Sequence, residues 1–184
     1  MRLQSREECC YTIDHLYAII SDVEQYHSFV PWCDKSVIIE EEQGGDLLVD
    51  LHAKFGFMYE KYRSRVRCYP PRYSGNSNAG EAVSHDIEEQ LAAIGADVRY
   101  CAVQSTLVSG PFKRLNSVWF MHEKSQEFGV SVVYFLLDVE FMNKVFKSMA
   151  KVYFNTAYRR IKKSFYDRAQ LLYDADKAAD KVVT

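Results

Sequence analysis

The residues best suited to chemistry lie in the segment 58–67, where the side-chain types alternate along the chain. Glu60, Tyr62 and Ser64 share one face of a predicted strand with Val66, and four cations share the other face. An unpaired charge is costly to bury, so the basic face is expected to point outward and the Glu60 face inward. A carboxyl group enclosed by apolar side chains can serve as a general acid or base, which makes Glu60 the candidate for a cyclase-type reaction. No convincing second catalytic partner accompanies it, and the alternative is that the three polar groups satisfy one another in a filled core.

The other reactive residues show no spacing typical of a catalytic or metal site. The five histidines form neither an H-x-x-x-H nor an H-E-x-x-H pattern, and no G-x-S-x-G or P-loop sequence occurs. The five cysteines include no C-x-x-C pair, which favours reduced thiols. The sequence therefore favours a protein that is not an enzyme and that uses no metal and no catalytic cofactor.

Length, net charge and composition limit the classes of protein to which the chain can belong. A chain of 184 residues is typical of a single domain, 1–184, and a net charge of −2 gives no basic excess for nucleic-acid binding. No specific nucleic-acid partner is expected. No apolar run approaches the roughly 20 residues of a membrane-spanning helix. Aromatic residues make up 14% of the chain, which indicates that large flat side chains are being packed.

Periodicity and turn residues predict about seven strands and one long final helix. Strands are expected at 8–12, 36–41, 46–54, 56–69, 98–107, 116–123 and 128–141, and the final helix at 143–173. Two short helices, 14–20 and 22–29, each begin with an aspartate at the N-cap position. The segment 73–97 is interpreted as a mobile insertion loop and 174–184 as a frayed tail, which leaves a core of 9–173.

The last strand and the last helix together predict the architecture. Asp138 and Glu140 belong outside, so Phe135, Leu137 and their alternate neighbours face inward. A sheet with one apolar face needs a cover, and only the final helix is long enough. The predicted class is α+β, an antiparallel sheet wrapped around a long C-terminal helix. Such an arrangement either closes tightly or encloses a cavity, and the sequence leaves both open.

Three motifs resemble a known family. They are Tyr17-x8-Tyr26-x2-Phe29-Val30-Pro31-Trp32-Cys33-x2-Ser36, Glu60-x-Tyr62-x-Ser64-x-Val66, and Gly110-Pro111-Phe112-x2-Leu115-x3-Trp119. Phe141 then leads into a helix that carries Phe154, Phe165 and Arg168-Ala169. In these residues the chain is similar to the coenzyme Q (ubiquinone) binding proteins, within the START-like, polyketide-cyclase-like superfamily. The resemblance spans residues 9–173 apart from the insertion.

This resemblance implies a helix-grip fold with a hydrophobic tunnel that holds ubiquinone or a similar polyprenyl lipid. It implies a lipid chaperone that supports respiratory electron transport and ubiquinone biosynthesis, with respiratory or quinone-biosynthesis proteins as partners. It places the protein in mitochondria, at the matrix side of the inner membrane, although residues 1–8 show no targeting sequence. Bacterial relatives include a toxin-like protein that acts on ribosomal subunits, so a ribosome-associated interaction protein is the alternative.

Sixteen residues are predicted to contact the lipid, because they lie on inward faces or in the family motifs. They are Phe29, Trp32, Phe55, Phe57, Glu60, Tyr62, Ser64, Val66, Leu115, Trp119, Phe135, Leu137, Phe146, Met149, Tyr153 and Phe165. Phe55 and Phe57 fall on the outward side of the alternation, so a bulge at Gly56 is expected to turn them inward.

Two basic strips are predicted to hold the protein against an anionic membrane surface as a peripheral protein. The first lies on the strand and the second on the final helix: Lys61, Arg63, Arg65 and Arg67, then Arg159, Lys162 and Lys163. Each cation near such a surface contributes about 1 kcal/mol. The alternative is that both strips are simply solvated.

Overall fold

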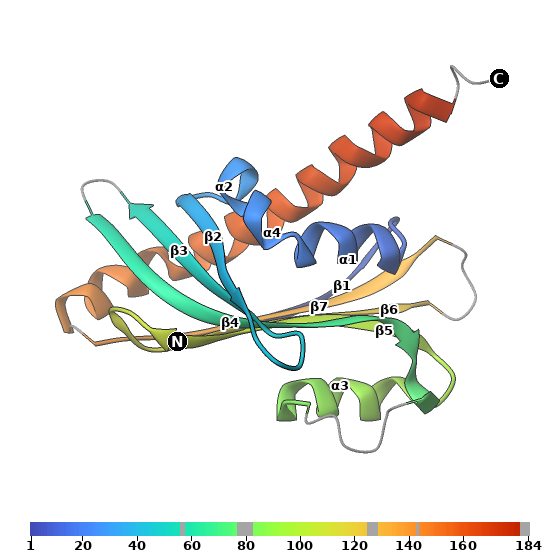
Figure 1. Ribbon diagram of the computed structural model, residues 1–184, viewed down its shortest axis with the longest axis horizontal. Helices are drawn as coiled ribbons and strands as arrows, with labels where there is room; N and C mark the ends of the chain where they lie inside the picture. The colour runs from blue at the N-terminus through green and yellow to red at the C-terminus, as the bar shows by residue number, and fades with distance from the viewer. Residues whose placement is uncertain (56–57, 77–82, 125–128, 143, 181–184) are drawn as a thin grey trace.

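The computed structural model describes residues 1–55, 58–76, 83–124, 129–142 and 144–180. In these residues seven strands form one antiparallel sheet in the order β1-β7-β6-β5-β4-β3-β2, which curls around the helix α4 (Figure 1). The strands are β1 (Arg2–Cys9), β2 (Cys33–Glu41), β3 (Leu47–Phe55), β4 (Met58–Tyr73), β5 (Arg99–Ser109), β6 (Phe112–Glu123) and β7 (Ser131–Phe141). The predicted α+β helix-grip architecture is confirmed.

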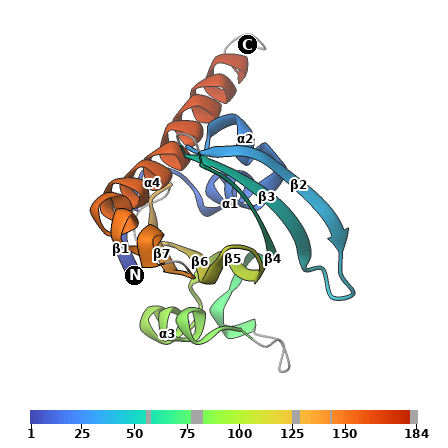
Figure 2. The ribbon, with the colours of Figure 1, turned by 90° about the vertical axis from the view of Figure 1, so that its left-hand side faces the viewer.

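Helices lie on both sides of the sheet. The α-helices are α1 (Ile13–Ser21), α2 (Tyr26–Phe29), α3 (His85–Ile94) and α4 (Lys144–Asp180), and the 3-10 turns are η1 (Val23–Gln25) and η2 (Ser74–Asn76). The concave side of the sheet holds α1, α2 and α4, and the opposite, convex side holds α3 (Figures 1 and 2). None of the described helices combines the length and the apolar character needed to cross a lipid bilayer.

The first helix does not begin as predicted. The N-cap of α1 is Thr12, whose hydroxyl accepts a hydrogen bond from the backbone N–H of His15 at 3.3 Å. Asp14 lies in the first turn instead, where its carboxylate pairs with Arg99 at 2.7 Å. Asp22 precedes η1 but makes no side-chain cap. Thr and Asp are both good N-cap residues, so the sequence alone could not choose between neighbouring candidates.

The strand β4 runs further than the two prolines suggested. It was predicted to stop at Pro70-Pro71 but continues to Tyr73, with a register shift against β5 between Tyr69 and Arg72. Its pairing with β3 ends at Val66, so one edge of β4 is unpaired beyond that residue. Proline is tolerated at a bulge and on an edge, because no ladder hydrogen bond is needed from its nitrogen.

The interpretation of 73–97 as a mobile loop is wrong for its second half. Residues 85–94 form α3, whose Ile87 is 0% exposed and packs against the convex face of the sheet. Beneath it lie Tyr69 of β4, Tyr100 of β5 and Phe120 of β6. The central strands are therefore buried on both faces, and on β7 every residue from Ser131 to Leu137 is buried.

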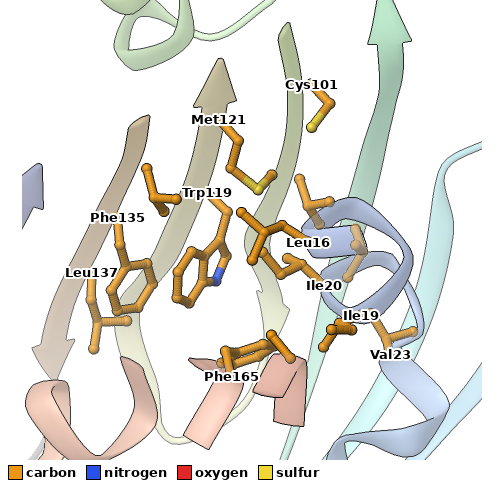
Figure 3. Close-up of a cluster of buried hydrophobic side chains, with 14 of the residues drawn as sticks. Leu16, Ile19, Ile20, Val23, Cys101, Trp119, Met121, Phe135, Leu137 and Phe165 are labelled. Carbon is orange, nitrogen blue, oxygen red and sulfur yellow. The ribbon is translucent and has the colours of Figure 1, made fainter. Parts of the chain in front are cut away.

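The concave face carries the larger core. Val133, Phe135 and Leu137 of β7 face inward, as predicted, and meet Phe165 of α4. Figure 3 shows Phe135, Leu137 and Phe165 together with residues of α1 such as Leu16 and Ile20. The helices α1 and α4 thus cover different parts of the same face, and a space remains between α4 and the sheet.

Candidate functional site

A cavity of about 300 Å³ lies between α4 and the concave face of the sheet. Its wall is formed by side chains from β2 to β7, from α4, from η1 and α2, and from the turn 30–32 that joins α2 to β2. Most of these side chains are aliphatic or aromatic, and only a few carry a hydroxyl, thiol or imidazole group. A concave apolar space with a few polar groups is typical of a site for a small hydrophobic ligand.

Half of the residues predicted to contact a lipid line this cavity. They are Trp32, Tyr62, Val66, Leu115, Trp119, Phe135, Leu137 and Phe165. The structure brings them together from five elements because the inward faces of the strands converge under α4. Their contact with a ligand remains a prediction.

Aromatic stacking shapes one wall. The rings of Trp119 and Phe135 are 4.0 Å apart and nearly parallel, and Phe135 stacks in turn on Tyr158 of α4 at 4.9 Å. The Tyr158 hydroxyl donates a hydrogen bond to the Phe135 carbonyl at 2.8 Å. Phe165 packs on Trp119 at 4.9 Å. These contacts fix α4 against β6 and β7, so that wall is rigid and well packed.

Phe29 lies behind the cavity wall. Its ring is 5.1 Å from Phe165 and 5.8 Å from Tyr26, and the Arg168 guanidinium lies 5.7 Å from it. The hydroxyl of Tyr26 donates to the carbonyl of Ile20, and burial raises the pKa of Tyr26. Phe29 is therefore not at the cavity, and its role is to dock α2 on α4.

Trp32 has an unusual backbone at the edge of the cavity. Its φ is +66°, in the left-handed region that a bulky residue rarely adopts. Its carbonyl accepts a hydrogen bond from Lys54 N–H at 2.8 Å, and the Arg160 guanidinium lies 6.0 Å from its ring. These contacts hold the indole between β2 and α4. Backbone strain of this kind clusters at ligand sites.

The polar residues of β4 do not converge on one point. Tyr62 lines the cavity and its ring packs on Phe112 at 5.6 Å. Gly110 allows this, because a side chain at that position would lie 2.5 Å from the Tyr62 Cβ. Burial raises the pKa of Tyr62, so its hydroxyl stays protonated. The tyrosine is thus a neutral wall residue.

Ser64 and Glu60 lie on the same strand face but away from the cavity wall. Ser64 is fully buried, and its hydroxyl makes no hydrogen bond within the described residues. Glu60 is half-buried and pairs in register with Ala53, which does line the cavity. The structure therefore does not assemble Glu60, Tyr62 and Ser64 into an acid–base site. Among the described residues, no group of three metal-binding side chains is present.

Five further predicted residues are placed differently or lie outside the description. Tyr153 is 54% exposed and does not line the cavity. Phe57 lies outside the described residues, as does the expected bulge at Gly56. The side chains of Phe55, Phe146 and Met149 lie outside the described side chains.

Several polar wall residues escaped the sequence analysis. Ser105, Ser117, His52 and Cys33 all line the cavity. Burial raises the pKa of the Cys33 thiol to about 11, so it is neutral at physiological pH. Each serine lies two residues from another cavity-lining residue of its strand and so shares the inward face. The signal was therefore present in the period of two along β5 and β6.

The basic strip on β4 faces outward, as predicted, but it is electrically compensated. Arg63 and Lys61 both pair with Asp50, at 2.6 and 2.8 Å. The Arg63 guanidinium hydrogen-bonded to Asp50 holds the pKa of that carboxyl well below its usual range. Two more arginines pair with acids of the β2–β3 turn: Arg65 with Glu42 at 2.5 Å and Arg67 with Asp46 at 2.6 Å.

The basic strip on α4 is only partly compensated. Lys162 pairs with Glu7 of β1, and Lys163 pairs with Asp167 one helical turn on, at 2.6 Å. Arg159 is exposed. From residue 142 to residue 166 the sequence contains seven lysines and arginines and no acidic residue. The basic character of the molecule is therefore concentrated on α4.

A curled antiparallel sheet that grips a long C-terminal helix over an apolar cavity defines a START-like, helix-grip protein. A START superfamily protein from Mycobacterium smegmatis has this fold, with a TM-score of 0.65 and 15% identity over 93% of this chain and 98% of that chain. Residues 9–166 match the family described as polyketide cyclase / dehydrase and lipid transport, and the chain belongs to that family.

Two curated relatives are named for different functions. The chain is 23% identical over 164 residues to a mitochondrial coenzyme Q-binding protein, COQ10 homolog B, of Xenopus laevis, covering 89% of this chain and 55% of the relative. It is 26% identical over 166 residues to the ribosome association toxin RatA of Escherichia coli, covering 90% of this chain and 84% of the relative. The chain thus spans little more than half the length of the frog relative, and neither relative is clearly nearer.

Proposed function

We propose that the protein binds a polyprenyl quinone, or a closely related isoprenoid lipid, in the cavity under α4 and carries it without chemical change. The observation that supports this most directly is the apolar cavity of about 300 Å³ itself, in a chain whose family includes lipid transport. The frog relative named for coenzyme Q binding supports the choice of a quinone. The scattered positions of Glu60, Tyr62 and Ser64 favour a carrier over a cyclase.

Hydrophobic burial explains why such a site would hold an isoprenoid. Removing one CH₂ group from water is worth roughly 0.8 kcal/mol, so a five-carbon unit gains about 3–4 kcal/mol. A neutral hydrogen bond contributes about 1 kcal/mol net. The hydrocarbon portion therefore supplies most of the affinity, and the few polar groups select among ligands.

Extraction of the purified protein tests this proposal. Protein produced in a quinone-making host is extracted with organic solvent and the extract is analysed by mass spectrometry for quinones and other isoprenoids. Ala157→Phe, which places a ring in the cavity, is expected to remove most of the lipid. Thr156→Phe, at an exposed neighbouring position of α4, is the matched control and is expected to retain it. An extract of the unaltered protein with no isoprenoid would contradict the proposal.

The proposal includes peripheral contact with an anionic membrane, and it assigns that contact to α4 instead of β4. The cations of β4 are paired with carboxylates of neighbouring residues. Arg159 of α4 is exposed and lies in a segment of the sequence without acidic residues. Arg159→Glu should weaken sedimentation with anionic vesicles about thirtyfold, because the reversal changes the charge by two units and each unit near the surface is worth about 1 kcal/mol. The matched reversal Lys61→Glu should have a smaller effect. Equal effects would reject this assignment.

Under this proposal the protein supports respiratory electron transport and ubiquinone biosynthesis at the mitochondrial inner membrane, as the resemblance to coenzyme Q binding proteins implies. Its protein partners would be the enzymes that make or use the quinone. Identification of the compartment by tagging the protein in its own cells checks this part separately.

A second candidate function is association with ribosomal subunits. It is favoured by the RatA relative, which is matched over 84% of its length. Sedimentation of the protein with purified ribosomal subunits through a sucrose gradient separates the two candidates. A lipid carrier remains at the top of the gradient, and a ribosome-directed protein moves with a subunit.

A further inference from the structure

The floor of the cavity carries an isolated pair of hydroxyl groups. Ser105 of β5 and Ser117 of β6 are directly opposite each other in the ladder, and both line the cavity. Side chains opposite each other in an antiparallel pair have Cβ atoms about 4.5–5.5 Å apart. The same cross-strand row continues with Val66 on one side and Leu137 on the other. The two hydroxyls therefore lie together in an otherwise apolar floor.

These hydroxyls are not used by the protein itself. In the part of the chain that the structure describes, neither one makes a hydrogen bond to another protein group. Other inward serines are used: the Ser131 hydroxyl donates to the Tyr11 carbonyl at 2.6 Å. A hydroxyl facing an apolar space is unfavourable unless a partner reaches it. Two adjacent hydroxyls in this position point to a ligand that carries a hydrogen-bond acceptor.

The size of the cavity decides how much of a polyprenyl quinone it can hold. A cavity of about 300 Å³ is at the lower end of the range of about 300–1,000 Å³ found for sites of small organic ligands. That is close to the size of a substituted quinone ring, or of two isoprenyl units, but not of a ring together with a long tail. Only one end of such a ligand is enclosed in this structure.

We propose that the enclosed end is the quinone ring, which enters first and accepts hydrogen bonds from Ser105 and Ser117, with the tail leaving past Trp32. This inference rests on the proposed function and names the part of the ligand that the site recognises. A tail-first ligand would leave both hydroxyls against hydrocarbon with no partner. A ring-first ligand supplies carbonyl oxygens, which accept hydrogen bonds and donate none.

The test compares two probes on matched variants. Ubiquinone-1, which has one isoprenyl unit, is measured by its quenching of tryptophan fluorescence. Farnesene, an isoprenoid hydrocarbon without oxygen, is measured by its displacement of bound ubiquinone-1. Ser105→Ala with Ser117→Ala should weaken ubiquinone-1 binding about thirtyfold, because two neutral hydrogen bonds are lost, and should leave farnesene binding unchanged. Ser109→Ala, at an exposed position of the same strand, is the control and should change neither.

Each outcome has a distinct meaning. Equal weakening of both probes, or no change for ubiquinone-1, overturns the ring-first inference but leaves lipid binding in place. Binding of neither probe by the unaltered protein overturns the proposed function as well. The double alanine variant removes two hydroxyls without cutting a protein hydrogen bond, so its thermal unfolding temperature should not fall, which confirms that the comparison is made on folded protein.

A second measurement locates the ring directly. The chain has two tryptophans, Trp32 near the edge of the cavity and Trp119 beside Ser117 on the same strand face. In the variant Trp32→Phe, ubiquinone-1 should still quench most of the remaining fluorescence, because the ring lies next to Trp119. Loss of quenching with unchanged affinity would place the ring at the opening and reject the inference.

Discussion

The two faces of the central strands are both buried, but they are built differently. On the convex face, α3 closes over Tyr69, Tyr100 and Phe120, with Tyr100 and Phe120 stacked at 5.5 Å. On the concave face, α4 stands off the sheet and leaves the cavity. Short α3 follows the sheet surface closely, whereas the long α4 is held by bulky rings at Trp119 and Phe165. The convex face is therefore filled by packing alone, whereas the concave face carries both the larger core and the cavity.

The largest expected effect is on the convex face. Phe120→Ala removes a fully buried ring and should lower the free energy of unfolding by about 3–5 kcal/mol, measured by urea denaturation. The folded fraction should keep its normal amount of bound lipid, because Phe120 points away from the cavity. A loss of less than 1 kcal/mol, or an emptied cavity, would show that the two faces do not have separate roles.

A smaller effect on stability is expected at the cavity wall. Leu115→Ala should lower the free energy of unfolding by about 1–2 kcal/mol, because part of the side chain already faces empty space and fewer contacts are lost. The lipid recovered by extraction should fall several-fold. Val108→Ala, at an exposed position of β5, is the control and should change neither quantity.

The ion pairs of Asp50 with Lys61 and Arg63, on the outward face of β3 and β4, predict that the free energy of unfolding depends on pH. Asp50→Asn should lower the free energy of unfolding by about 1 kcal/mol at pH 7. The pKa of Asp50 in the folded protein is below its unfolded value of about 4. The stabilisation is therefore fully present above pH 4 and is lost as the pH falls from there through the pKa of the folded state. Urea denaturation should show a smaller difference between the variant and the parent at pH 3 than at pH 7, and a constant difference would contradict this cause.

The smallest expected effect is at Ser64. Its hydroxyl is buried without a hydrogen-bond partner in the described residues, so Ser64→Ala should leave stability unchanged or raise it by up to about 1 kcal/mol. Lipid recovery should not change, because Ser64 does not line the cavity. A loss of bound lipid with unchanged stability would show that Ser64 does contact the lipid.

The concave face was predictable from sequence because its signals are local. Alternation along 58–67 and 131–141 fixed which side chains point inward, and the Gly44-Gly45 turn, with φ of +121° and +83°, fixed the β2–β3 hairpin. The same period of two would also have found Ser105 and Ser117. They were missed because charged residues indicate the outward face clearly on β4 and β7, and no such inward-facing set was assigned for β5 and β6.

The convex face was missed for a different reason. Ile87, Leu91 and Ile94 have the i, i+4, i+7 spacing of an amphipathic helix, but they lie in a segment rich in Ser, Gly, Asn and acids that is typical of a loop. Whether the concave side is hollow or filled could not be predicted at all. That difference depends on the distance between α4 and the sheet, which is set by how large rings from distant parts of the chain pack together.

The helix α3 also restricts how the cavity can enlarge for a larger ligand. By bracing the back of β4 to β7 it fixes their curvature, so extra room cannot be made by flattening the sheet. Enlargement has to come from the opposite wall, where α4 meets the turn at Trp32 with its left-handed backbone. Under the proposed function, a ligand would enter and leave by movement of α4 and Trp32 against a stiff sheet.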